Sequence, residues 1–106
     1  MIDKTIVKVS NVINSEIAVT NSDARTLFDL IQTNINNNVV SILDFSDIQT
    51  LTTAFLNISI GNLYSIAEPD DLSNLVQIDP EAIKPLQYEK VIEVIQNAKQ
   101  KHLTGK

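Results

Sequence analysis

The sequence predicts an α/β fold in which strands and helices follow one another in the order β-β-α-β-α-β-α. Three observations support this prediction. Apolar residues recur at three- and four-residue spacing over 24–35 and again over 91–98, which is the period of an amphipathic helix. Between these segments, residues 39–45 form a nearly continuous apolar, β-branched run, typical of a strand buried on both faces by helices. The alternation of strands and helices favours a sheet with central parallel strands.

The N-terminal part of the chain predicts two strands. Residues 5–14 are rich in β-branched side chains, and residues 16–20 resume the same pattern. Such side chains favour an extended backbone because they pack well on a pleated surface. We therefore expect a hairpin whose turn lies at Asn14 and Ser15.

A helix is expected next, with Asn21 or Ser22 as its capping residue and Asp23 in its first turn. Its apolar face is formed by Ala24, Leu27, Phe28, Ile31 and Ile35. The asparagines at 36–38 are expected to end this helix, because asparagine adopts left-handed backbone conformations and its side chain competes with helical hydrogen bonds.

The strand over 39–45 leads into a turn at Ser46 and Asp47. Two apolar side chains in the loop that follows, those of Ile48 and Leu51, are expected to enter the core.

A second helix is expected to begin at Thr52 or Thr53 and to continue to about Ala67, because a threonine oxygen can accept a hydrogen bond from a first-turn amide. Gly61 lies inside this predicted helix, where glycine costs about 1 kcal/mol relative to alanine. Its presence therefore indicates close packing against a neighbouring element.

The last third of the chain predicts a break, a strand and a long helix. Residues 68–71, Glu-Pro-Asp-Asp, are expected to interrupt the chain, and residues 74–79 to form a further strand. Pro80 and Pro85 bracket an irregular connection. The final helix is predicted over about 87–103.

The composition predicts one domain over residues 1–106, since this length matches a single compact unit and 43% apolar residues can form a core. The absence of cysteine excludes disulfides, thiolate metal sites and a cysteine nucleophile. A single histidine, His102, excludes multi-histidine metal centres and most catalytic triads. We therefore expect a protein that is not an enzyme and that holds no metal and no cofactor.

The charge pattern argues against nucleic-acid binding. The net charge is −5, and no basic residue lies between Arg25 and Lys84, so the central part of the chain cannot neutralise phosphates. No apolar run approaches the roughly 18 residues of a membrane span. The N-terminus lacks the basic start and apolar stretch of a secretory signal, which together with the absence of cysteine favours a cytoplasmic location.

Asp44 is the most informative carboxylate, because it ends the predicted middle strand, and α/β folds place ligand sites at the carboxyl ends of parallel strands. Asp47 and the hydroxyls of Ser46, Thr52 and Thr53 follow within a short segment. In one interpretation they form a small acidic site that holds a cation near a phosphorylatable hydroxyl. In the other, Asp44 caps loop amides and a threonine caps the helix. Two aspartates without a third converging ligand do not define a metal site.

Residues 40–56 resemble the STAS superfamily, and most closely the bacterial STAS-like domains of unknown function. The residues that carry the resemblance are Leu43-Asp44-Phe45 at the end of the apolar strand, Ile48 and Leu51 in the loop, and Phe55 in the next helix. The likeness is strongest over 39–64 and extends over about 15–100. It implies a four-stranded mixed sheet with three helices.

In the related anti-sigma factor antagonists, an Asp-Ser-Ser-Gly step at this helix start holds a serine that a partner kinase phosphorylates, and phosphorylation releases a bound partner. The corresponding step here is Thr52-Thr53-Ala54-Phe55, in which Thr53 aligns with the phosphoacceptor. Thr52 replaces the aspartate and Phe55 replaces the glycine. The resemblance implies a surface for partner contact even where the switch motif has changed.

Three functional hypotheses follow. The first is a non-catalytic interaction module that docks a cytoplasmic protein through the loop after Asp44 and the helix from Thr53; the resemblance implies a histidine-kinase-like ATPase as the kind of partner. The expected contact residues are Asp44, Ser46, Asp47, Thr52, Thr53 and Phe55. The alternative is a small-ligand or nucleotide-binding sensor that uses the same helix N-terminus, whose amides and dipole attract phosphate. An enzyme using Asp44 and Asp47 as acid and base is a third hypothesis.

Overall fold

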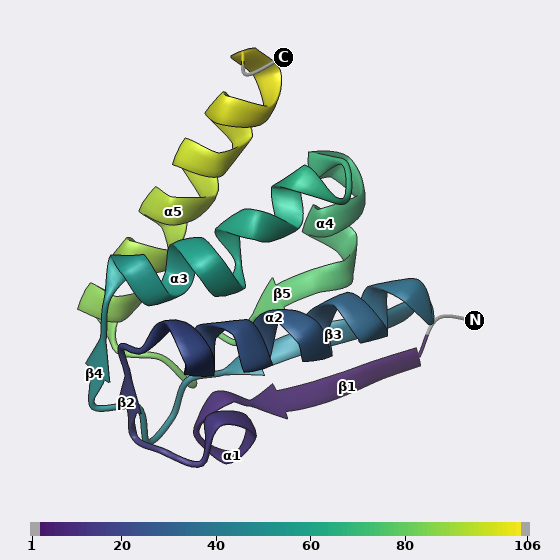
Figure 1. Cartoon of the computed structure of the whole chain (residues 1–106). Helices are drawn as coiled ribbons and strands as arrows, with labels where there is room; N and C mark the ends of the chain where they lie inside the picture. The colour runs from purple at the N-terminus through teal and green to yellow at the C-terminus, as the bar shows by residue number, and fades with distance from the viewer. Residues whose placement is uncertain (1–2, 105–106) are drawn as a thin grey trace.

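The computed structural model describes residues 3–104, with side chains for 3–101, so the side chain of His102 lies outside the described part. The elements, shown in Figure 1, are β1 (Asp3–Lys8), α1 (Val9–Ile13), β2 (Ile17–Ala18), α2 (Asn21–Asn36), β3 (Val39–Asp44), β4 (Thr50–Leu51), α3 (Thr53–Ser59), the 3₁₀ helix η1 (Gly61–Ser65), α4 (Pro69–Leu75), β5 (Val76–Ile78) and α5 (Pro85–Thr104). The predicted α/β class is confirmed.

The strands form two small parallel sheets within residues 3–104. β3 is the central strand of a three-stranded sheet in the order β1-β3-β5, and β2 pairs with β4 in a separate two-stranded sheet. The prediction of central parallel strands is therefore confirmed. The four-stranded mixed sheet with three helices is not found, because the described residues form five α-helices and the second strand pairs away from the first.

The predicted N-terminal hairpin is wrong. The chain leaves β1 at Lys8 and forms the short helix α1, in which Val9 and Ile13 are both buried one helical turn apart. Asn14 then ends this helix in a left-handed conformation (φ 56°) that asparagine tolerates. Core contacts thus override the β-branched composition of this segment.

Helix α2 confirms the predicted apolar face, with Ala24, Leu27 and Ile31 buried. Its cap is Thr20, one residue earlier than expected, whose side chain accepts a hydrogen bond from the Asp23 amide at 3.1 Å. The asparagine run ends the helix as predicted: Asn36 is its last residue, and Asn38 adopts a left-handed φ of 63°.

The predicted helix from Thr53 to about Ala67 is divided. α3 ends at Ser59 and is followed by the 3₁₀ helix η1. A β-carbon built at Gly61 would meet Val94 Cγ1 at 3.6 Å, which is ordinary contact, so a side chain as small as a methyl group fits at this position. The expected break at 68–71 is instead the start of α4, with Pro69 at its first position.

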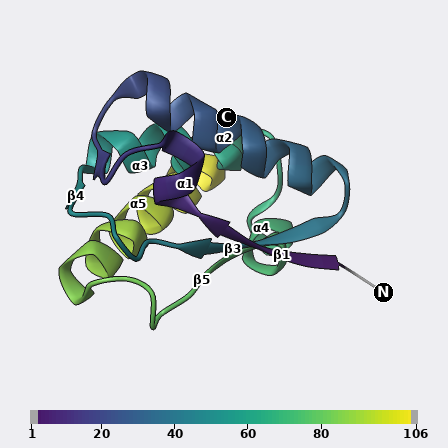
Figure 2. The same cartoon turned by 90° about the horizontal axis from the view of Figure 1, so that it is seen from below.

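The core lies between the three-stranded sheet and the helices. α2 packs against β3 and α3, and α3 packs against α5, as Figure 2 shows from below. Ser41 and Leu43 of β3 are fully buried, and Asn34 of α2 donates a hydrogen bond from Nδ2 to Ser41 Oγ at 2.9 Å.

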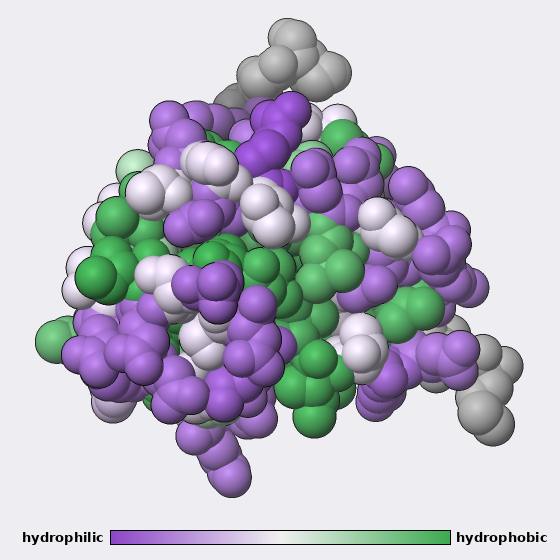
Figure 3. Space-filling view, turned by 60° about the horizontal axis from the view of Figure 1, so that its bottom comes forward, coloured by the Kyte–Doolittle hydropathy of each residue, from purple (hydrophilic) through white to green (hydrophobic). Residues whose placement is uncertain are grey.

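The opposite face of the sheet is less covered. Ile42 of β3 is half-buried, and Ile6, its register partner on β1, is 68% exposed. Figure 3 shows hydrophobic side chains reaching the surface between polar ones on the lower side of the molecule. Over the described residues, no helix is both long and apolar enough to cross a membrane.

Candidate functional site

Four polar residues gather where β1 and β3 end; we call Lys8, Asp44, Ser46 and Asp47 the loop cluster. Because β1 and β3 run parallel in register, Lys8 lies opposite Asp44 at the carboxyl end of the sheet. The loop after β3 then brings Ser46 and Asp47 to the same end. This is the position at which α/β sheets place ligand-binding loops.

The carboxylate of Asp44 holds the start of this loop. Its Oδ1 accepts two hydrogen bonds from Ser46, one from the backbone amide at 2.8 Å and one from the hydroxyl at 2.6 Å. The side chain is half-buried. Asp44 therefore caps a loop amide, as one of the two interpretations of the sequence predicted.

Asp47 occupies a strained position at the tip of the turn. Its φ of 72° lies in the left-handed region, which aspartate adopts more readily than most residues. Its Oδ2 forms an ion pair with Lys8 Nζ at 3.0 Å, with the two side chains 58% and 36% exposed.

The pKa of Lys8 is raised above its ordinary value of 10.5, first by the hydrogen bond from its ammonium to Asp47 and then by the charges of Asp47 and Asp44. The ammonium is thus held in its charged form by the loop that it fixes.

Thr52 and Thr53 lie at the other end of β4, so the structure divides the predicted site into two parts. Figure 1 shows β4 running from the loop up to the start of α3. Thr52 Oγ1 accepts a hydrogen bond from the Phe55 amide at 3.1 Å, which makes Thr52 the cap of α3. The next residue, Thr53, is exposed.

Phe55 does not belong to a contact surface. Its side chain is fully buried in the core. The expectation that it meets a partner is corrected, since a buried ring offers no surface. Ile48 and Leu51 enter the core as predicted, at 0% and 2% exposure.

The side chains of the loop cluster hold the loop backbone in place, and each of the two carboxylates already has a partner within the cluster. Asp44 Oδ1 is engaged by Ser46, and Asp47 by Lys8. Among the described residues, no three histidine, aspartate or glutamate side chains converge as metal ligands. Lys8 could not be predicted from the sequence, because only the parallel register of β1 and β3 places it beside Asp44.

Fold and site together define a small α/β domain whose polar loop follows a buried central strand and leads into a capped helix. A comparison with protein families agrees with this description. The chain belongs to the family of STAS-like domains of unknown function (DUF4325), whose model matches residues 23–78. The match includes β3, the loop cluster except Lys8, and α3. No curated protein and no solved structure matches the chain.

Proposed function

We propose that this domain is a non-catalytic regulatory module that docks a protein partner through the surface between the loop cluster and α3. We define the docking strip as Asp47, Gln49, Thr50 and Thr53, four polar residues of one continuous segment. All four side chains are exposed, whereas Ile48 and Leu51 between them are buried. The strip replaces the wider set of contact residues expected from the sequence.

The observation that carries the proposal is that the backbone of the docking strip is fixed along its whole length. At one end, Asp44 and Lys8 hold the turn. In the middle, the Gln49 amide donates to the carbonyl of Glu16, the residue before β2, at 2.7 Å. The Thr52 amide donates to the carbonyl of Ala18 in β2 at 3.3 Å.

The Thr52 cap fixes the other end of the strip. A surface that is already ordered loses little conformational entropy when a partner binds. This segment is therefore well suited to docking.

A non-catalytic role is supported by the use of the acidic groups. An acid–base pair needs carboxylates that face a substrate with separated pKa values. Here Asp44 accepts two hydrogen bonds from its own loop and Asp47 pairs with Lys8, so both carboxylates serve to shape the loop.

The partner we propose is a protein with a basic or hydrogen-bonding surface, of which a histidine-kinase-like ATPase is the kind that the family resemblance suggests. The absence of basic residues between Arg25 and Lys84 leaves this part of the chain acidic. Electrostatic complementarity would then steer the encounter. Thr53 is an exposed residue, which is what a phosphoacceptor for such a kinase requires.

The test measures binding of purified candidate ATPases by calorimetry, with and without ATP, to the wild-type chain and to Asp47→Asn and Thr53→Arg. Asparagine keeps the left-handed backbone but removes the charge. We expect Thr53→Arg to weaken binding about tenfold or more, since it places a bulky charge in the contact. Asp47→Asn should weaken it less, together with a reduced salt dependence.

Gln96→Arg is the matched control, because Gln96 is exposed on α5 outside the docking strip. Circular dichroism checks that each variant is folded. If all three variants bind a partner as tightly as the wild type does, the docking surface lies elsewhere. Mass spectrometry after incubation with the ATPase and ATP shows whether Thr53 receives phosphate; modification at another residue would contradict its role as acceptor.

A further inference from the structure

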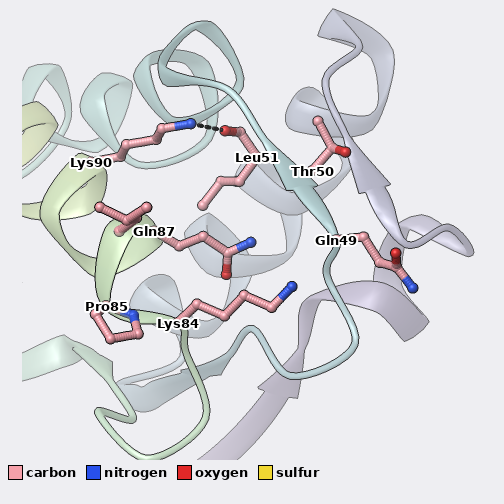
Figure 4. Close-up of a pocket in the computed structure, with 8 residues that line it drawn as sticks. Gln49, Thr50, Leu51, Lys84, Pro85, Gln87 and Lys90 are labelled. Atoms are coloured by element: carbon pink, nitrogen blue, oxygen red, sulfur yellow. Dashed lines mark hydrogen bonds between the residues drawn. The ribbon is translucent and has the colours of Figure 1, made fainter.

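A cavity of about 530 Å³ lies beside the docking strip, between β4 and the beginning of α5. Figure 4 shows its lining, with the segment from Gln49 to Leu51 on one side and the segment from Lys84 to Lys90 on the other. Cavities of this size hold small organic molecules. Gln49 and Thr50 line this cavity and also belong to the docking strip, but the proposed docking function does not require the cavity to be filled.

The lining is positively charged although the protein is acidic overall. Of the described residues that line the cavity, two are lysines, Lys84 and Lys90, and none is acidic. Lys90 Nζ donates to Leu51 O at 2.8 Å, which uses one of the three donors of an ammonium group. The remaining donors and the exposed Lys84 favour an anion.

The backbone at the start of α5 adds to this preference. The Tyr88 amide donates to Lys84 O at 2.9 Å, so the amides of Leu86 and Gln87 precede the first helical hydrogen bond. Lysine has no side-chain acceptor to cap them. The positive end of a 20-residue helix therefore adjoins the cavity.

Gln87 gives an independent sign of a missing partner. This side chain is only 7% exposed, and its Oε1 is buried with no hydrogen-bond partner among the described residues. Its Nε2 donates to Ile48 O at 3.0 Å. Because a carbonyl oxygen can only accept, this bond fixes the amide and excludes the flipped orientation.

The position of Gln87 points to the cavity. Figure 4 shows its amide extending into the space between Leu51 and Lys84. Buried acceptors are normally paired, so an unpaired oxygen at a cavity indicates a place for a hydrogen-bond donor.

Apolar groups form the remaining wall. Leu51 and Pro85 line the cavity, and Leu86 does so while 73% of its surface is exposed to solvent. A ligand that covered Leu86 would remove apolar surface from water.

We infer that this cavity binds a small aliphatic carboxylate that carries a hydroxyl group next to the carboxyl carbon. The carboxylate faces Lys84 and the amides at the start of α5, the hydroxyl donates to Gln87 Oε1, and the aliphatic part covers Leu51 and Leu86. A hydroxyl fits better than an ammonium group, because the nearby lysines repel a second cation. The inference does not rest on the proposed docking function.

The first test needs no variant. 2-Hydroxy-4-methylpentanoate and its deoxy analogue 4-methylpentanoate are titrated into the ¹⁵N-labelled chain and followed by amide chemical shifts. We expect the hydroxy acid to shift residues 49–51 and 84–90 and to bind about tenfold more tightly, since one hydrogen bond to an unpaired acceptor separates the two probes. Equal affinity, shifts elsewhere or no shifts at about 10 mM probe would overturn the inference.

The second test uses variants of α5. Lys84→Gln should weaken binding of the hydroxy acid about two- to fivefold, as expected for an exposed charge pair. The matched control is Lys99→Gln, at an exposed lysine of the same helix that does not line the cavity. In Gln87→Leu the preference for the hydroxy acid should disappear. An unchanged preference in that variant would show that Gln87 is not the acceptor.

Leucine serves as a third probe in the same titration. If leucine binds more tightly than the hydroxy acid, the inference that a neutral hydroxyl, and not an ammonium group, donates to Gln87 Oε1 is contradicted.

Discussion

Thr52 is the residue at which the extended chain of β4 becomes the helix α3. Its Oγ1 accepts the Phe55 amide at 3.1 Å, and its carbonyl accepts the Leu56 amide at 3.2 Å. Both bonds form only if Thr52 itself stays extended, as its ψ of 154° shows. The side chain therefore fixes the point from which Thr53 is presented to solvent.

Thr52→Ala is expected to lower the free energy of unfolding by about 1 kcal/mol, because the Phe55 amide loses its acceptor. Urea denaturation followed by circular dichroism measures the change. The exposed neighbour gives the control, since Thr53→Ala should stay within about 0.5 kcal/mol of the wild type. A larger loss at Thr53 than at Thr52 would show that the cap is assigned to the wrong residue.

The ion pair between Lys8 and Asp47 predicts a specific pH dependence. The folded-state pKa of Lys8 is raised above 10.5, so its stabilising effect is fully present below that value and is lost as the pH rises through the folded-state pKa. The stability difference between wild type and Lys8→Met should be constant between about pH 7 and 9 and should shrink above pH 10.5.

Denaturation curves across this pH range test the prediction, with Lys4→Met, on the same strand, as the control. A pH-independent difference, or an equal effect at Lys4, would mean that the contact with Asp47 contributes nothing.

At the scale of elements, strong periodicity was predictive. The apolar faces of α2 and α5 and the apolar run of β3 were placed correctly, because each pattern is long enough to dominate local signals. Short elements were not placed correctly. The two residues of β4 carry no periodicity and exist only through pairing with β2.

Helix α4 was missed for a different reason. Pro69 was interpreted as a break, although proline at the first helical position fits its fixed φ, and Asp70 and Asp71 favour the positive end of the helix. The sequence thus contains a helix start signal at the position where a break is expected.

Gly61 provides a prediction about the junction of α3 and η1. Gly61→Ala is expected to stabilise the protein by about 0.4–1 kcal/mol, since alanine lowers the entropy of the unfolded chain and its methyl group finds ordinary contact at 3.6 Å from Val94 Cγ1. Gly61→Val should be less stable than Gly61→Ala, because its additional methyl groups crowd Val94. Thermal and urea unfolding measure both. Destabilisation by alanine would show that the junction requires glycine.

At the scale of the whole molecule, the loop cluster and the cavity depend on tertiary structure that local patterns do not encode. Asp44, Ser46 and Asp47 were expected to lie together because they are close in sequence. Lys8 joins them through the β1–β3 register, and Gln87 reaches Ile48 O from α5 across 39 positions. No spacing in the sequence brings these partners together.

Phe55 is fully buried in the core on α3, a helix that packs against both α2 and α5. Phe55→Ala should lower the free energy of unfolding by about 3–5 kcal/mol through lost burial and the cavity that remains. Urea denaturation tests this, with Ala54→Gly on the exposed side of α3 expected to cost about 1 kcal/mol. A loss below that of Ala54→Gly would contradict the core position of the ring.

The all-parallel pairing of the strands has a consequence for how the chain folds. Asp3 pairs with Val39, Ile17 with Thr50 and Ser41 with Val76, so each pairing joins positions more than thirty residues apart. Within residues 3–104, no neighbouring pair of strands can nucleate as a hairpin, and loop closure must precede any ladder. Stopped-flow refolding should therefore be slower than that of a helical bundle of equal length, and substitutions in β3 should retard refolding more than substitutions in α5.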